Sequence, residues 1–252
     1  MVSDLDEDRL SEFLEWFLDG RQPSTVWSAR KHLMALAAYA QKKGLLHEVP
    51  DIAKIRRESR APQAYGIDDI VRLMAAARGV EGEISGVPAP SFWSAFFLAA
   101  YYTGARWSPL WALEWADYQP PFLLFRAEHS KTRKDQLLKV SPQCIDALEA
   151  IRKPERKIIF DHPHKCRARY NHVRMIFIAA GLPHGRRDLL QRIRRTTLTL
   201  MHRAGGDATF QAGHADSLTT RRYYLDSTDS LYAADVLPPI NLPTTDRQAR
   251  LF

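Results

Sequence analysis

The strongest constraint on the fold is an almost entirely apolar run at residues 91–102 (SFWSAFFLAAYY). It predicts a helix that runs through the core, because a surface helix would show polar residues every three or four positions. The run ends in Thr103-Gly104-Ala105-Arg106, where the glycine predicts a turn. We therefore expect a domain built around this helix, with the guanidinium of Arg106 held at a cleft beside its end.

Helical periodicity covers most of the remaining chain. Ser24 or Thr25 is the expected N-cap of the second helix and Gly44 its stop, while Ser141 and Gly181 are expected to bound later helices. The expected helices span 8–19, 25–44, 67–78, 91–102, 141–152, 165–180 and 187–203, with a short pair from 217 onward. Residues 121–142 differ, since two short apolar runs flank a charged turn there, which predicts a β-hairpin. The fold class expected is mainly α with a small antiparallel β-hairpin sheet.

A polar, basic stretch with two prolines at 49–64 predicts a linker, and we place a domain boundary near residue 62. This gives a reduced N-terminal helical domain with its linker at 1–61 and a larger domain at 62–228. A tail at 229–252 follows. The tail carries apolar residues with little else near them in the sequence to bury them: Leu231, Tyr232, Val236, Leu237 and Ile240.

The charge of the chain favours a polyanionic partner. Its 252 residues include 36 Lys and Arg against 29 Asp and Glu, a formal net charge of +7. Residues 161–203 alone hold ten basic and two acidic side chains. Such a concentrated stripe is typical of a phosphate-binding surface, because counterion release rewards clustered cations. A solvated helix face rich in arginine is the alternative.

The composition also restricts the cellular setting and the metal chemistry. Two cysteines exclude a disulfide framework and favour a reduced, cytoplasmic setting. The acidic N-terminus lacks an apolar segment, and no run approaches the roughly 18 apolar residues of a membrane span, so no membrane is expected. His162, His164 and Cys166 could ligate zinc, but a fourth ligand at standard spacing is missing, so neither a metal nor a cofactor is expected.

Five short motifs follow one another along the chain. The first is Thr103-Gly104-Ala105-Arg106, and the second is HSKTRKD with Lys131. The third, QRIRRTT, places Gln191, Arg194 and Arg195 on one helix face. Gly213-His214 is the fourth, and the pair Tyr223 and Tyr224 follows the histidine by nine and ten residues. In this order and spacing they resemble the tyrosine recombinase (phage integrase) family of DNA strand-exchange enzymes, over about residues 65–228 and more loosely in the two N-terminal helices.

The resemblance implies a role for each motif. Arg106 and Arg194 would clamp a phosphate, because two planar guanidiniums can each offer a bidentate fork. Lys131 would protonate the leaving 5′-oxygen, and Gln191 and His214 would complete the site. Tyr224 would attack the phosphodiester and form a 3′-phosphotyrosine, without metal or ATP.

The resemblance also implies the partners. They would be double-stranded DNA and, in a tetramer on two DNA sites, further copies of the chain, acting in the cytoplasm on the nucleoid. The 1–61 domain would close over the duplex as a clamp. The tail would dock on a neighbouring copy, although folding back on its own chain fits the sequence equally.

The sequence departs from the family pattern at two positions. Gln191 stands where a histidine is usual, and Pro109 stands where an acidic residue commonly follows the first arginine. The nucleophile is also ambiguous: Tyr224, followed by Leu225-Asp226, is preferred over Tyr223. Four further arginines are expected to contact the DNA backbone or to form a solvated helix face: Arg186, Arg187, Arg192 and Arg195.

Two other functions stay open. A recombinase-like protein that binds DNA without cutting it would agree with the glutamine and the proline. A type IB topoisomerase-like enzyme would nick and close DNA with the same residues but would not exchange strands.

Overall fold

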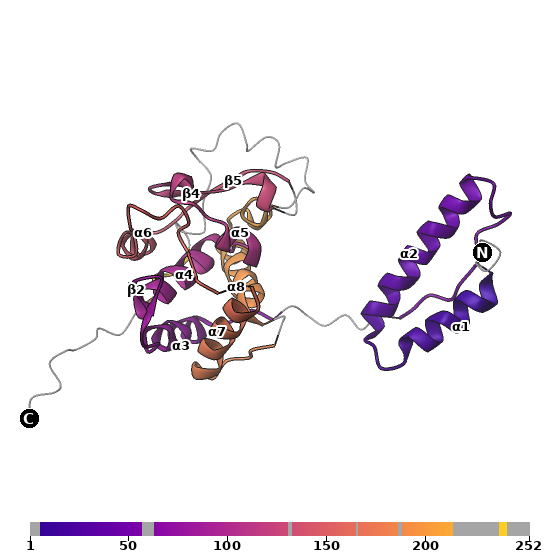
Figure 1. The fold of residues 1–252 in the computed structure, drawn as a ribbon, viewed down its shortest axis with the longest axis horizontal. Coiled ribbons are helices and arrows are strands. Elements are labelled where there is room, and N and C mark those ends of the chain that lie inside the picture. Colours follow the sequence, from indigo (N-terminus) through magenta and orange to yellow (C-terminus); the bar gives the residue numbers. More distant parts are fainter. Residues whose placement is uncertain are drawn as a thin grey trace, which may run out of the picture. The chain divides into compact units, whose positions relative to one another are not determined.

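The computed structural model describes residues 6–56, 63–130, 133–164, 166–185, 188–213 and 237–240. The chain divides into two compact units, Met1–Ala61 and Pro62–Phe252 (Figure 1). Several residues singled out in the sequence lie outside the described ranges, together with the short helices expected from 217 onward: Lys131, Arg186, Arg187, His214, Tyr223 and Tyr224.

The described residues of unit 1 form two helices, α1 (Glu7–Leu18) and α2 (Pro23–Lys42). The Asp6 carboxylate caps α1 by accepting the backbone N–H of Arg9 at 2.8 Å. The predicted start of α2 is wrong by two to three residues. Gln22 is its N-cap and Pro23 its first residue, because proline needs no amide partner there and its φ is already helical.

The core of unit 1 reaches into the predicted linker. Ile52 is 2% exposed and packs in one cluster with Leu10, Leu14 and Val26. The Arg30 guanidinium donates to the backbone carbonyls of Ile52 and Ala53, the latter at 2.9 Å. The linker predicted over 49–64 is therefore too long, since its first part folds back onto the helices.

Unit 2 is built around α4 (Ala89–Thr103), as the apolar run predicts. Twelve of its fifteen residues are buried, and it contacts α3 (Ile67–Arg78), α6 (Pro142–Glu149) and α8 (Leu189–Arg203) (Figure 1). The described residues of the unit form three further α-helices: α5 (Trp107–Trp111), α7 (Cys166–Ala179) and α9 (Ala208–Ala212). Ser141 caps α6 as expected, accepting from the Cys144 amide at 3.3 Å.

The predicted hairpin is confirmed, with one strand more than expected. β3 (Tyr118–Gln119), β4 (Phe122–Phe125) and β5 (Gln136–Lys139) form an antiparallel sheet in that order. Phe125 pairs with Gln136 at the end of the ladder, so the loop that includes Lys131 begins and ends at this pair. A second hairpin, β1 (Glu83–Ile84) with β2 (Val87–Pro88), has strands too short to show a period in the sequence. The expected class, mainly α with small antiparallel sheets, is confirmed.

His162, from the stretch weighed as a zinc ligand, is a core residue. It is 3% exposed, with its ring 5.9 Å from the rings of both Trp93 and Trp111. Its Nε2 lies 3.1 Å from Nδ1 of His172. Burial first, and then His172, lower the pKa of His162 to about 4. The imidazole is therefore neutral at physiological pH. No helix in the described part of the chain combines the length and hydropathy of a membrane span.

Candidate active site

The site is built on the C-terminal end of α4. The last carbonyl groups of a helix have no partner inside it, and here side chains from other elements supply the donors. The Thr197 hydroxyl donates to the carbonyl of Tyr101 at 2.6 Å. The Gln211 amide donates to the carbonyls of Tyr102 and Thr103 at 3.2 and 2.9 Å. The Arg194 guanidinium donates to the carbonyl of Gly104 at 2.6 Å. Helices α8 and α9 are thereby joined to the end of α4.

Gly104 makes this close approach possible. Its φ is +61°, in the left-handed region, and it ends α4 so that Arg106 becomes the N-cap of α5. A Cβ at position 104 would lie 3.3 Å from Cγ2 of Thr197. The glycine of the Thr103–Arg106 turn is therefore required both by its backbone angle and by the packing of α8.

Gly104→Ala is expected to destabilise unit 2 by about 1–2 kcal/mol, because an L-residue in the left-handed region costs that much before any clash. For a unit of this size the melting temperature should fall by roughly 2–8 °C. Gly79→Ala is the matched control, since Gly79 has φ −81° and only ordinary contacts around its added Cβ. Equal melting temperatures for the two variants in a thermal unfolding experiment would contradict this role of Gly104.

Arg194 and Arg106 bring two positive charges to this helix end. The Arg194 side chain is buried, with 5% of the residue exposed, and Arg106 is half-buried. Burial first, and then repulsion from Arg106, lower the pKa of Arg194 to about 10. Arg194 is still charged at neutral pH. Two guanidiniums that repel each other in a partly buried place favour an anion between them, and phosphate matches their planar forks.

The other predicted residues of α8 take different positions. Gln191 is exposed in the first turn of the helix, and the Arg195 Nε donates to its backbone carbonyl at 3.3 Å. The Arg192 side chain is only 14% exposed and lies 4.5 Å over the Tyr65 ring. The solvated-face alternative is therefore wrong for Arg192, whose stem and head pack against the domain. A DNA contact for Arg192 and Arg195 stays a prediction.

The hairpin touches the same site through Gln136. The Gln136 amide donates to the carbonyls of Phe210 and Gln211 in α9, at 2.8 and 3.0 Å. Gly213 then ends α9 with φ +58°. A Cβ at Gly213 would lie 2.8 Å from Oε1 of Gln136. The base of the Lys131 loop is thus bonded to the segment that leads into His214, although both residues lie outside the described ranges.

The amino-acid sequence matches no protein-family model, and no curated protein matches it. Solved structures are similar to it in fold. The XerH site-specific recombinase bound to palindromic difH substrate, in a post-cleavage complex, is 17% identical with a TM-score of 0.66, over 90% of this chain and 70% of that chain. A lambda integrase dimer bound to a COC′ core site is 16% identical with a TM-score of 0.64, over 86% and 81% of the two chains. The Tn1549 transposon integrase with a circular intermediate DNA is 11% identical with a TM-score of 0.64, over 89% and 85%.

The chain has the fold of the tyrosine recombinases. This fold agrees with the order of the five recombinase-like motifs along the sequence. Among the motif residues that are described, Arg106 and Arg194 are the two that it brings together.

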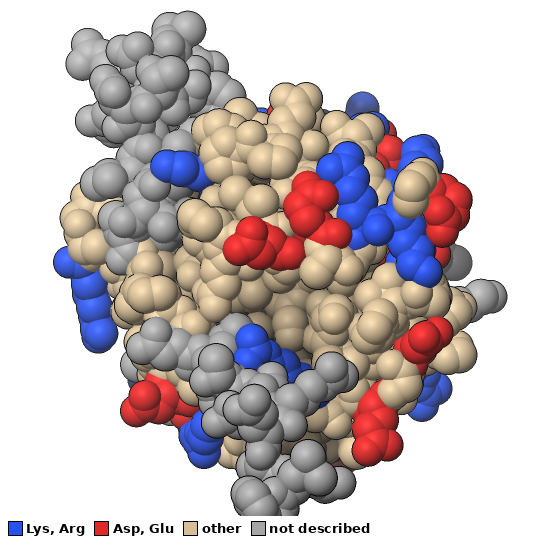
Figure 2. Space-filling view, turned by 90° about the vertical axis from the view of Figure 1, so that its left-hand side faces the viewer, with Lys and Arg blue, Asp and Glu red and all other residues tan. Residues whose placement is uncertain are grey.

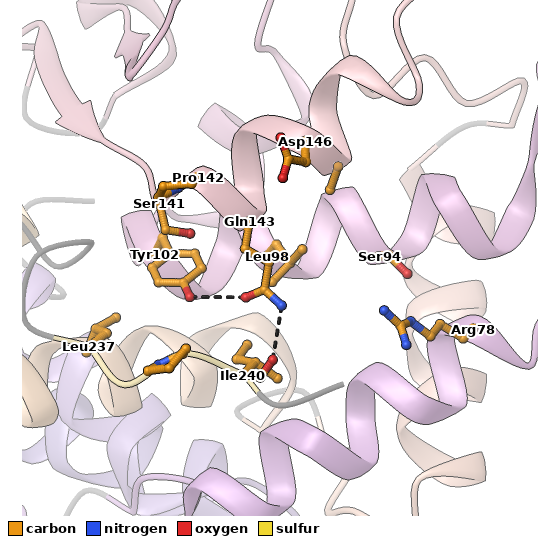
Figure 3. Close-up of a pocket in the computed structure, with 12 residues that line it drawn as sticks. Arg78, Ser94, Leu98, Tyr102, Ser141, Pro142, Gln143, Asp146, Leu237 and Ile240 are labelled. Atoms are coloured by element: carbon orange, nitrogen blue, oxygen red, sulfur yellow. Dashed lines mark hydrogen bonds between the residues drawn. The ribbon is translucent and has the colours of Figure 1, made fainter. Parts of the chain in front are cut away.

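In this tyrosine recombinase fold, a cavity of about 890 Å³ has neither Arg106 nor Arg194 in its lining. It is lined by side chains of α4 and α6, with Arg78 of α3 at one end and residues 237–240 at the other (Figure 3). The Gln143 amide donates to the carbonyl of Ile240 at 3.0 Å, and Ile240 is 2% exposed. Of the two arrangements expected for the tail, the described residues 237–240 adopt the one on their own chain.

Figure 2 shows the face of the molecule that lies on the left in Figure 1. Acidic and basic side chains are mixed around an uncharged hollow there (Figure 2). A surface for a polyanion is expected to be basic throughout.

Two residues of the site were missed in the sequence, Gln136 and Gln211. Neither belongs to a family motif. The one sequence signal for Gln211 is its place directly before Ala212-Gly213-His214. A helix as short as α9 would most simply be held by an apolar residue there, so a polar amide at this position stands out.

Proposed function

We propose that this protein is a site-specific DNA recombinase or integrase that cuts and rejoins strands through a 3′-phosphotyrosine intermediate, without metal or ATP. The observation that carries the proposal is the pair Arg106 and Arg194, one half-buried and one buried, close enough to repel each other at the end of α4 in a tyrosine recombinase fold. Such a pair supplies fixed positive charge where a phosphodiester gains negative charge during attack.

The reaction balances without an energy source. The Tyr224 oxygen attacks phosphorus and gives its proton to water, while the bond to the 5′-oxygen breaks and Lys131 protonates that oxygen. A second 5′-hydroxyl then attacks the phosphotyrosine, which restores a phosphodiester and the free tyrosine. One phosphate ester bond is exchanged for another in each step, so no ATP is needed.

The bonds of Gln136 support the placing of Lys131 and His214 in the same site. They join the strand directly after the Lys131 loop to α9, and α9 ends one residue before Gly213. Gln211 joins α9 in turn to the end of α4. His214 would then lie near the phosphate as a hydrogen-bond donor, and Lys131 would approach it from the loop.

For the partners we propose double-stranded DNA and further copies of the chain. XerH and lambda integrase, to which this chain is similar, are described as bound to a substrate DNA and to a core site. Residues 1–61 would clamp the duplex, and 62–228 would carry out catalysis. Arg186, Arg187, Arg192 and Arg195 would contact the DNA backbone. In a tetramer, the 229–252 tail would dock on a neighbouring copy, and residues 237–240 would then leave their place on their own chain.

Gln191→His is expected to raise the cleavage rate by about 10-fold or more, because an imidazole near the phosphate can hold or give a proton at neutral pH and an amide cannot. Gln191 is exposed in α8, so the substitution should fold without repacking. The initial rate of plasmid relaxation checks this, with Gln191→Ala as the control. A rate for Gln191→His no higher than that of the wild type would contradict the role given to this position.

Relaxation of negatively supercoiled plasmid in EDTA without ATP tests the proposed function. Relaxation by the wild type is expected. Salt-sensitive binding without relaxation would favour the DNA-binding alternative, and Pro109 and Gln191 would then be the first positions to restore. Relaxation without any exchange between two DNA sites would favour the topoisomerase-like alternative.

A further inference from the structure

We infer that Gln136 and Gln211 are positioning residues, whose side-chain amides fix the hairpin and α9 against the end of α4 in the geometry that cleavage requires. The inference rests on the proposed function. Neither residue touches the proposed phosphate. Each acts through the backbone carbonyls that it binds.

Gln211 is a fully buried amide in a short helix. It has no exposed surface, and α9 spans only five residues, too few to hold a helical conformation alone. The Asp207 carboxylate caps its start by accepting the amides of Thr209 and Phe210, at 2.8 and 2.9 Å. Its position against unit 2 therefore depends on contacts such as the two bonds from Gln211 to Tyr102 and Thr103.

Gln136 supplies the other end of the connection. It is the first residue of β5 and pairs with Phe125 where the Lys131 loop closes. Its amide nitrogen has two protons, and it donates to two carbonyls of α9, so its position is fixed relative to that helix. The side chains of Gln136 and Gln211 thus form a chain of four hydrogen bonds from the hairpin through α9 to α4.

This chain ends beside the arginine pair. Gln211 holds the carbonyl of Thr103, and Arg194 holds that of Gly104, the next residue along. Arg106 follows two residues later. The elements that carry Lys131, His214, Arg106 and Arg194 are therefore connected by adjacent hydrogen bonds at one helix end, whereas the large core around α4 holds the rest of unit 2. Loss of an amide should move the reacting groups relative to one another without unfolding the unit.

The test compares Gln211→Leu, Gln136→Leu and the double variant with the wild type. The matched control is Thr196→Val, which removes a buried bond of 2.7 Å from the Tyr65 amide; the hydroxyl of Thr196 bonds Tyr65 and Arg192, which belong neither to α9 nor to the hairpin. The measurements are the rate of plasmid relaxation in EDTA at saturating protein, the affinity for a short duplex, and the melting temperature. Gln136 is only half-buried, so Gln136→Leu keeps the test valid if Gln211→Leu does not fold.

Each Gln→Leu variant is expected to lose about 100-fold in rate, the usual effect of a displacement near 1 Å, with the DNA affinity of the wild type. The double variant should lose less rate than the product of the two single losses. Its rate should be close to that of one single variant, because both amides belong to the same connection. Thr196→Val should lose stability but keep its rate. Gln→Leu variants as fast as Thr196→Val, or rates that follow the melting temperature alone, would overturn the inference. An inactive wild type would instead overturn the proposed function, and this inference with it.

Discussion

Replacing Arg194 with methionine is expected to slow strand cleavage by at least about 10²–10³-fold, the loss found when one preorganised donor to a reacting anion is removed. Methionine keeps the length of the buried stem and removes the charge and the planar fork. The rate of plasmid relaxation measures the effect. Arg194→Lys is the informative companion, because it keeps the charge but not the bidentate geometry, and it should recover little of the rate.

The same substitution should leave the protein folded. Lowering the pKa of Arg194 to about 10 corresponds to a cost on the order of 3 kcal/mol for holding the charged group in the folded state. Loss of the bond to the Gly104 carbonyl costs about 1–3 kcal/mol in the opposite direction. Since the two effects nearly cancel, the melting temperature of Arg194→Met should stay close to that of the wild type.

A bound anion should stabilise the wild type and not the variant. An anion between Arg106 and Arg194 relieves their repulsion, so inorganic sulfate should raise the melting temperature of the wild type with its concentration, as expected for a ligand that binds only the folded state. Arg194→Met should show a much smaller rise. An equal rise in both proteins would contradict the assignment of the arginine pair as the phosphate site.

Tyr224→Phe is expected to abolish the covalent protein–DNA adduct completely, because removal of the hydroxyl leaves no nucleophile at the proposed position. Tyr223→Phe should retain adduct formation. In the helix expected from residue 217 onward, neighbouring residues would point about 100° apart, so only one of the two hydroxyls would face the phosphate in a given arrangement. An SDS trap and gel separation of protein-linked DNA measure the adduct.

The two variants are matched controls for each other, as each removes one hydroxyl from the same pair. Loss of the adduct in Tyr223→Phe alone would exchange the two roles. Adduct in both single variants would require the double variant Tyr223→Phe/Tyr224→Phe, and adduct in that protein would place the nucleophile elsewhere in the chain.

The fold was predictable where the sequence patterns are long. The 91–102 run could only become a buried helix, and α4 is one, with helices predicted around it close to their observed bounds. The predicted element boundaries are wrong where a few local contacts determine where an element begins or ends. The start of α2 depends on Pro23, the extent of the linker depends on the burial of Ile52, and β1 and β2 have two residues each.

Only those site residues that belong to the sequence motifs could be predicted. Arg106 and Arg194 are 88 residues apart in the sequence, and the motif order was the reason to expect them together. Arg192 shows the limit of charge patterns, because the sequence does not reveal that its head would pack over Tyr65. Gln136 carries no sequence signal, and Gln211 only its place before Ala212-Gly213-His214, since the role of both depends on which helix end their amides meet in three dimensions.

The central claim is a metal-free covalent phosphotyrosine, and identification of the residue linked to DNA tests it most directly. Wild-type protein is incubated with supercoiled plasmid in EDTA, trapped with SDS, and digested with nuclease and protease, and the nucleotide-bearing peptide is then sequenced by mass spectrometry. The account predicts a peptide that contains Tyr223 and Tyr224, with the modification on Tyr224 and none in Tyr224→Phe. A nucleotide linked to any residue outside this pair, or no linked peptide from protein that binds the plasmid, would contradict it.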